Sequence, residues 1–238
     1  MIFQILMASA QDIGEVVAQA GPVREELSFS LIGMAIKGGW IMIPLLILSL
    51  IAIYIFGEKW WTIRKAAHID ENFIRNIKDY INDGKIQAAL SLCEATDTPI
   101  ARMVEKGIRR IGRPLPDIQT SIENVGNVEV ARLEKKLPIL ATIAGGAPMI
   151  GFLGTVMGMI QAFFNMSQAG NNVDITLLSG GIYVAMVTTV AGLIVGILAY
   201  FGYNYLTSSI NDIVYKMESS SIEFMDMLHE PSVTAKKA

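Results

Sequence analysis

Three threonines lie in the middle of long apolar stretches of this chain: Thr155, and the neighbours Thr188 and Thr189. At apolar depth a hydroxyl can hydrogen-bond a group that gains and loses a proton, so these residues suit proton transfer beside an acid. A threonine in an apolar helix also bonds readily to the carbonyl one turn back. This purely structural use of each hydroxyl stays open.

Two of these hydroxyls are expected at similar depth. Thr155 lies ten residues before the end of its apolar stretch, and Thr189 lies about fourteen residues after the start of the next. At ~1.5 Å per helical residue they lie roughly 15 and 21 Å from the same face, within about one turn of each other. We therefore expect both near the middle of a membrane.

The two stretches contain no residue that titrates. Between Lys136 and Asp174, and again between Asp174 and Asp212, there is no Asp, Glu, Lys, Arg or His. A proton relay across a membrane needs a titratable group in its path. If the chain takes part in proton transfer, another chain must supply the carboxylate.

Small residues recur every three or four positions in both stretches, which is the pattern of helices that approach each other closely. Ordinary bundle packing is the favoured explanation for the glycines. The residues predicted to pack these two helices against each other, in what we call the wall, are Gly151, Gly154, Gly158, Ala185, Gly192 and Gly196.

The composition is that of a membrane protein. Of the 238 residues, 52% are hydrophobic and 17% charged, and a helix needs about 20 apolar residues to cross a bilayer. Three windows meet this requirement, so we predict an all-α membrane protein with transmembrane helices at 39–57, 138–165 and 175–206.

The basic residues predict the orientation of the spans. Most of the 19 Lys and Arg residues lie in segment 58–137, whereas the loop 166–174 has none. By the positive-inside rule, segment 58–137 and the C-terminal segment 207–238 are cytoplasmic. The N-terminal segment 1–38 then lies outside, as an interfacial amphipathic segment, with a clipped signal sequence as the less favoured alternative.

Segment 58–137 is predicted to be a large helical domain. Apolar residues at helical spacing predict a helix that ends at Asn82-Asp83-Gly84, and Lys85 to Ala95 follows as a second. Thr98 and Pro99 suit the start of a third helix, which ends near Gly112. From Asp117 we expect one long helix that runs straight into the second span. Segment 207–238 is expected to form an amphipathic helix followed by a tail.

Several classes of function are not supported. The net charge of −3 gives no basic field for nucleic acid. No metal-ligand spacing or nucleophile–base pair is visible, and His68 and His229 stand alone, so we expect neither an enzyme nor a cofactor. The single cysteine, Cys93, is expected to be a small buried residue.

Three basic residues lie just before the second span: Arg132, Lys135 and Lys136. They are most simply topology anchors. A second interpretation is that they contact anionic lipid headgroups.

Three stretches of the sequence resemble the ExbB/TolQ/MotA family of proton-channel proteins, and its ExbB branch most closely: TPIARMVEKGI, EVARLEKKLPILATIAGGAPMIGFLGTVMGMIQAFF and GGIYVAMVTTVAGLIVGILAYFGYN. The resemblance extends from about Thr98 to Asn204, and GFLGTVMGMI after APMI is its most specific part. Two positions depart from the pattern: Val184 stands where many relatives have glutamate, and Leu198 where they have proline. Without that glutamate, a second titrating site in the pore is not expected.

The resemblance implies a homopentamer in the bacterial inner membrane, with the N-terminus periplasmic. Its second and third spans would enclose single helices of an ExbD-like partner, each with one aspartate. By motif position, Thr155 and Thr189 correspond to pore-facing hydroxyls. The function implied is a motor subunit that converts proton motive force into work on a TonB-like protein for nutrient import. A TolQ-like role in envelope constriction and a non-conducting membrane scaffold are the alternatives.

Overall fold

The computed structural model describes residues 39–67, 72–168 and 175–229, which are almost entirely helical. The expectations for segment 1–38, for His68, for loop residues 169–174 and for residues 230–238 lie outside the described residues. The helices are α3 (Met42–Ala67), α4 (Phe73–Asn82), α5 (Ile86–Thr96), α6 (Pro99–Ile108), α7 (Leu115–Glu134), α8 (Leu137–Gln168) and α9 (Ile175–His229).

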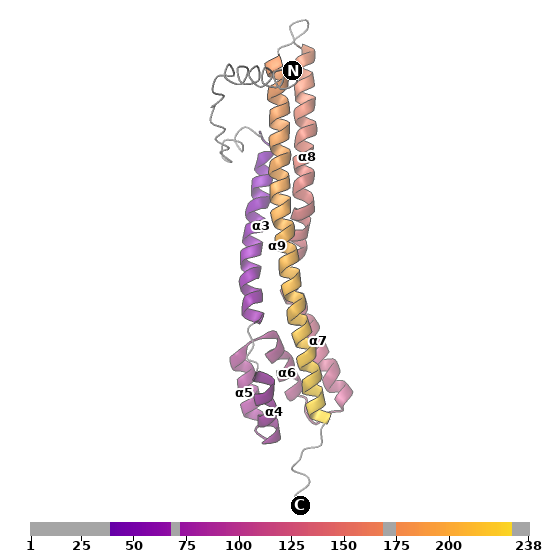
Figure 1. Cartoon of the computed structure of the whole chain (residues 1–238). Coiled ribbons are helices and arrows are strands. Elements are labelled where there is room, and N and C mark those ends of the chain that lie inside the picture. The colour runs from indigo at the N-terminus through magenta and orange to yellow at the C-terminus, as the bar shows by residue number, and fades with distance from the viewer. Residues whose placement is uncertain (1–38, 68–71, 169–174, 230–238) are drawn as a thin grey trace, which may run out of the picture. The chain divides into compact units, whose positions relative to one another are not determined.

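Three helical stretches of the described residues are long and apolar enough to cross a membrane. They are Met42–Ala67, the stretch that ends with α8 at Gln168, and Leu178–His229. Figure 1 shows α8 and α9 side by side, with α3 packed along them. The prediction of an all-α membrane protein with three transmembrane helices is therefore confirmed.

The third long helix continues without interruption beyond its apolar part. Helix α9 has 55 residues, which corresponds to about 82 Å at ~1.5 Å per residue, far more than a bilayer core of about 30 Å. The apolar part and the amphipathic helix expected within segment 207–238 are therefore one element. Its far end packs against α6, where a Cβ added at Gly107 would lie 2.6 Å from a ring carbon of Phe224.

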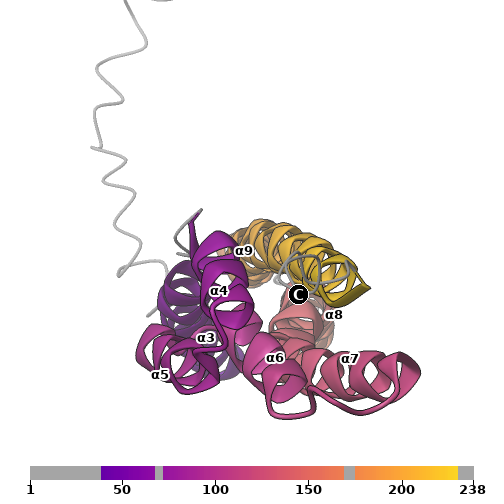
Figure 2. The same cartoon turned by 90° about the horizontal axis from the view of Figure 1, so that it is seen from below.

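The four short and medium helices α4 to α7 form the helical domain (Figure 2), in which α6 lies between α5 and α7. Helix α6 begins as predicted, because the hydroxyl of Thr98 accepts a hydrogen bond from the backbone N–H of Ala101 at 3.3 Å and Pro99 occupies the first turn. Buried side chains of this domain and of α9 join one core, including Ile77, Ile100, Ile122, Ile213 and Phe224.

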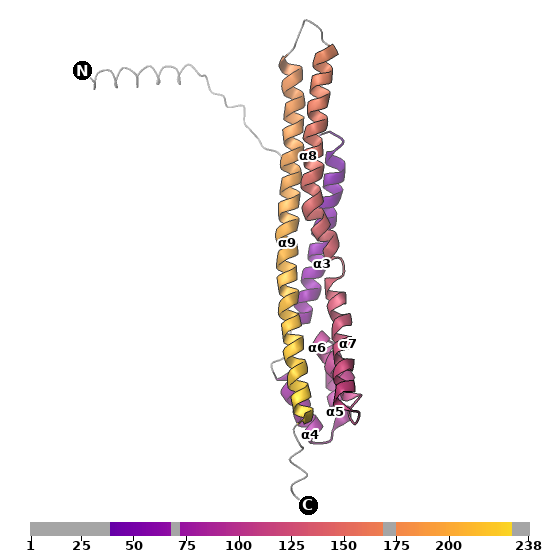
Figure 3. The ribbon, with the colours of Figure 1, turned by 90° about the vertical axis from the view of Figure 1, so that its right-hand side faces the viewer.

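The expectation that one helix runs from Asp117 into the second span is wrong. Helix α7 ends at Glu134 and α8 begins at Leu137 (Figure 3). Proline removes a helical hydrogen bond and its ring clashes with the carbonyl four residues earlier. For Pro138 that carbonyl belongs to Glu134, the last residue of α7. The chain therefore breaks here, and Pro138 is accommodated in the first turn of α8.

The break contains an unusual backbone conformation. Lys136 has φ +76°, in the left-handed region, which costs a residue with a side chain about 1–2 kcal/mol. Such a conformation persists where surrounding contacts impose it. The contacts of Lys136 are therefore of structural interest.

Candidate functional site

Helices α8 and α9 pack antiparallel through their small residues. Gly196 lies against Pro148, Gly192 against Gly151, and Ala185 against Gly158, so that one helix ascends as the other descends. A Cβ added at Gly192 would lie 2.6 Å from the carbonyl oxygen of Ala147 and 2.8 Å from the Cα of Gly151. Because both are backbone atoms, the close approach requires glycine here.

All six small residues predicted to pack the wall lie in this contact between α8 and α9. They are Gly151, Gly154, Gly158, Ala185, Gly192 and Gly196. The contact brings two backbones together deep within the apolar segments. It also decides which threonine side chains stay accessible.

Thr188 lies inside the contact. Its side chain has no exposed surface, and a Cβ added at Gly154 would lie 2.6 Å from its Cβ. Its hydroxyl donates a hydrogen bond to the carbonyl of Ala185 at 2.8 Å. The space left by Gly154 is thus filled by Thr188, which the sequence grouped with the pore-lining hydroxyls.

Thr155 and Thr189 lie at the edge of the contact, and both are half-buried. The Thr189 hydroxyl donates across the helices to the carbonyl of Gly151 at 3.0 Å. The Thr155 hydroxyl donates to the carbonyl of Phe152 within α8 at 2.6 Å. Since residues four apart share a face of a helix, Thr155 is one turn from Gly151 on the same face. The two hydroxyls therefore lie along one edge of the helix pair, about one turn apart.

The walls around these hydroxyls are apolar and uncharged. Neighbouring exposed side chains on α8 include Phe152, Val156 and Met159, and on α9 Met186, Val190 and Leu193. The nearest charged residues along the chain are Lys136 and Asp212 in the described part. The site offers hydrogen bonds to an acid but contains none of its own.

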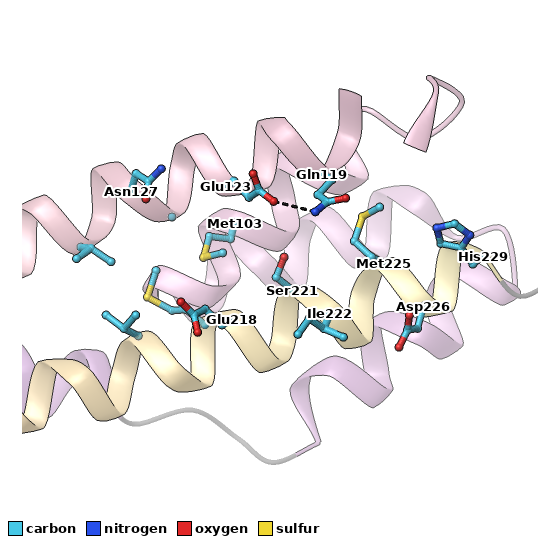
Figure 4. Close-up of a pocket in the computed structure, with 14 residues that line it drawn as sticks. Met103, Gln119, Glu123, Asn127, Glu218, Ser221, Ile222, Met225, Asp226 and His229 are labelled. Atoms are coloured by element: carbon cyan, nitrogen blue, oxygen red, sulfur yellow. Dashed lines mark hydrogen bonds between the residues drawn. The ribbon is translucent and has the colours of Figure 1, made fainter. Parts of the chain in front are cut away.

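The carboxylates that do line a cavity lie elsewhere. A groove of about 630 Å³ between α7 and α9 is lined by Met103, Glu123, Glu218, Asp226 and His229, among others. Figure 4 shows Ser221 on the side of α9 that faces Gln119 and Glu123 of α7, whereas Asp226 lies on the other side of α9. Glu218 is 29 residues along α9 from Thr189, which is about 44 Å. These acids cannot exchange protons with the threonine hydroxyls directly.

The three basic residues before α8 have different surroundings. The guanidinium of Arg132 pairs with Glu129 at 2.8 Å, and the ammonium of Lys136 pairs with Glu58 at 2.6 Å. Lys135 is exposed. Two of the three thus have protein partners, and contact with lipid headgroups stays a prediction.

One buried cation was missed by the sequence analysis. Lys59 on α3 is 5% exposed, and its ammonium donates to the carbonyls of Arg132 and Leu133, each at 3.0 Å. A charged pair, Glu58-Lys59, directly after an apolar window was the available signal. The pair comes directly after the predicted span 39–57, and nothing in the sequence shows which backbone carbonyls Lys59 reaches.

By its fold and this edge, the described part of the chain is a helical membrane protein whose two longest apolar helices pack antiparallel through glycines, with uncharged hydroxyls beside the contact. Residues 95–219, just over half of the chain, match the MotA/TolQ/ExbB proton channel family. The chain belongs to this family.

Individual relatives point to two branches of the family. The chain is 30% identical over 176 residues to the putative biopolymer transport protein ExbB-like 1 of Synechocystis sp., covering 73% of this chain and 69% of the relative. It is 27% identical over 146 residues to the biopolymer transport protein ExbB of Neisseria gonorrhoeae, covering 56% and 64%. It is 36% identical over 103 residues to the Tol-Pal system protein TolQ of Haemophilus influenzae, covering 43% and 45%.

Proposed function

We propose that this chain is the wall-forming subunit of a proton-driven motor in a bacterial inner membrane. Copies of the chain, as a homopentamer, enclose single-span ExbD-like helices that each carry one membrane aspartate, and the movement of the partner does work on a TonB-like protein for nutrient import. The observation that carries the proposal is the uncharged edge formed by Thr155 and Thr189, in a chain of the proton channel family.

The hydroxyls suit both states of a carboxyl group. Each now donates to a backbone carbonyl, which leaves its two lone pairs to accept a hydrogen bond from a protonated acid. When the acid loses its proton, the hydroxyl turns and donates to the carboxylate instead. The helix carbonyl that it leaves keeps its own intrahelical hydrogen bond. One residue can therefore serve the acid before and after proton transfer.

The free energy needed to place a charged acid in the membrane is comparable to the free energy that the membrane potential supplies. Placing a charged carboxylate at the membrane midplane costs at least ~2.5 kcal/mol. A potential of about 100 mV supplies roughly 2.3 kcal/mol for each charge that crosses. A neutral acid can thus move along the apolar wall and a charged one cannot, so proton flow can drive movement of the partner.

The distribution of basic residues supports the orientation. Most Lys and Arg residues lie between the first and second spans and none lies in loop 166–174. We therefore place the helical domain and the C-terminus in the cytoplasm and the N-terminus in the periplasm.

A TolQ-like role in envelope constriction is the second candidate. The observation in its favour is the 36% identity to the Haemophilus influenzae TolQ, although over a shorter stretch than the ExbB-like relatives. The same wall chemistry serves both roles, and the protein that receives the work distinguishes them. Pull-down of a TonB-like rather than a Tol-like protein from the native membrane would support the import role.

The test of the site is the double variant Thr155→Val with Thr189→Val, co-purified with its single-span partner and reconstituted in vesicles that contain a pH-sensitive dye. We expect proton flux to fall at least about tenfold, since each lost hydrogen bond to a charged group is worth roughly 1.5–3 kcal/mol. The double Thr→Ser variant should keep most of the flux.

The matched control is Thr142→Val. Thr142 is an exposed threonine on the same helix whose hydroxyl donates to the carbonyl of Pro138 at 2.9 Å, so flux should not change. Equal flux in the double valine variant and the wild type, with assembly intact, would mean that the hydroxyls of Thr155 and Thr189 take no part in the proton path.

A further inference from the structure

The two-residue break between α7 and α8 is where the helical domain joins the proposed pore helix. Lys135 is extended, with ψ 131°, and Lys136 is left-handed, with φ +76°. Two backbone hydrogen bonds flank the break: the N–H of Lys135 donates to Ala131, and the N–H of Ile139 donates to Lys136, both at 3.1 Å. Neither bond crosses the break. Its geometry must therefore be held by other contacts.

Lys59 of α3 holds the α7 side of the break. Its ammonium donates to the carbonyls of Arg132 and Leu133, both at 3.0 Å, and these belong to the last turn of α7. The final carbonyls of a helix have no partner within the helix and carry its negative dipole end. A buried ammonium in turn needs acceptors. Each side therefore satisfies a group that would otherwise be buried unpaired.

Glu58, the residue before Lys59, holds the break itself. Both of its carboxylate oxygens accept hydrogen bonds from the ammonium of Lys136, at 2.6 and 2.7 Å. That ammonium also lies 5.6 Å from the centre of the Tyr54 ring, one turn earlier on α3. Consecutive residues of α3 thus contact the end of α7 and the left-handed residue that precedes α8.

We propose that Glu58 and Lys59 form a clasp by which α3 fixes the α7–α8 joint, and that both act as positioning residues for the proton path. This inference rests on the proposed function. Lys136 and Thr155 are 19 residues apart, about 28 Å along α8. A change of 10° at the joint would displace Thr155 by roughly 5 Å relative to the helical domain. That distance exceeds the length of a hydrogen bond, so the joint must be stiff for the hydroxyl edge to stay in place.

The test is Lys59→Met in the complex with its single-span partner, with two readouts. Hydrogen exchange of the amides of Lys135 and Ile139 reports the joint directly, and proton flux into vesicles reports the path. We expect exchange at these amides to become roughly tenfold faster and flux to fall about tenfold. Lys59→Arg keeps donors for the two carbonyls, so we expect it to retain more of the amide protection and more of the proton flux than Lys59→Met does.

The matched control is Lys65→Met. Lys65 also lies on α3 but is exposed, and its ammonium approaches Asp97 only to 3.9 Å, so neither readout should change. The ion pair is tested by exchanging its charges: Glu58→Lys alone and Lys136→Glu alone should loosen the joint, and the double exchange should restore it. If Lys59→Met does not accumulate, Lys136→Ala is used instead, because the Lys136 side chain is about one third exposed. We expect faster amide exchange at the joint and lower proton flux in this variant too.

The outcomes separate the two proposals. Unchanged exchange at the joint in Lys59→Met, or no recovery in the double exchange, would overturn the clasp. Faster exchange with unaltered flux would also overturn it, because the joint would then be structural without positioning the path. Absence of flux in the wild-type complex would refute the proposed function, while the exchange data still decide whether the clasp exists.

Discussion

Cys93 gives a measurable consequence at the level of a single side chain. The thiol is 1% exposed, and burial raises its pKa to about 12 from an ordinary value of 9.0. The thiolate is the reactive form, so we expect a maleimide to label the folded protein at pH 8 at least 100-fold more slowly than the chain unfolded in detergent. Labelling followed by mass spectrometry measures both rates.

The raised pKa of Cys93 also determines how its contribution to the free energy of unfolding changes with pH. Between about pH 9 and 12 the unfolded thiol loses its proton and the folded one keeps it, so the unfolded state binds fewer protons and this contribution to stability falls as pH rises. Cys93→Ala should remove that part of the alkaline loss. Rapid labelling of the folded protein would contradict the burial of Cys93.

Neighbouring threonines show where prediction from sequence reaches its limit at this scale. Composition and spacing identify Thr188 and Thr189 together. Successive residues point about 100° apart on a helix, so only one of them can fill the space beside Gly154. Which one does so depends on the rotation of α9 against α8. That rotation arises from contacts between two helices, and it assigns Thr188 to packing and leaves Thr189 on the accessible edge.

At the scale of the elements, the α8–α9 contact predicts an unequal response to the same substitution. Gly192→Ala would place a Cβ 2.6 Å from a backbone oxygen and 2.8 Å from a Cα, and neither atom can move without shifting a helix. We expect a loss of about 1–3 kcal/mol in the free energy of unfolding, the usual range for overpacking. Steric trapping or denaturation in mixed detergent measures this loss.

Gly145→Ala is the control on α8, because a Cβ there meets no atom within 4 Å. It should be neutral or stabilising by up to ~1 kcal/mol, since alanine favours a helix more than glycine does. Similar losses in both variants would mean that the helices do not approach each other as closely as described.

Most elements could be predicted from periodicity and breakers. Helix α5 spans Ile86–Thr96 where Lys85 to Ala95 was expected, and α6 begins at Pro99 after its Thr98 cap. The α7–α8 break was not predicted, because the sequence contains no strong helix breaker between Asp117 and Pro138. The clasp was not predictable, since Lys59 bonds to carbonyls 73 and 74 residues away.

At the scale of the whole molecule, two kinds of connection link the apolar segments to the helical domain. Helix α9 passes from one to the other without a break over 55 residues, whereas α7 and α8 meet at a joint. The change in polarity near residue 206 predicted a span and a separate amphipathic helix. They form one helix, because backbone hydrogen bonding does not depend on side-chain polarity. One rigid and one jointed connection make the clasp at α3 mechanically significant.

The proposed function predicts that a chain with an uncharged wall conducts protons only together with a second protein. From Leu137 to Gln168 and from Ile175 to Asn211 there is no ionisable Asp, Glu, Lys, Arg or His, and hydroxyls do not release protons near neutral pH. Vesicles containing this chain alone should therefore show a proton flux at least about tenfold below that of vesicles containing the complex, since a relay needs a titratable group. Trapped pH-sensitive dye under an imposed potential measures both.

A control is needed to distinguish two reasons for low flux from the chain alone: the absence of the acid and the absence of the assembled complex. A complex in which the membrane aspartate of the proposed partner is changed to asparagine keeps the size and shape of that side chain, but the amide cannot lose a proton. If the carboxylate is what the wall lacks, this complex should conduct no better than the chain alone while remaining assembled on native mass spectrometry. Equal flux from the chain alone and from the complete complex would mean that protons pass along Thr155 and Thr189 through water, and the foreign acid would have no part in the path.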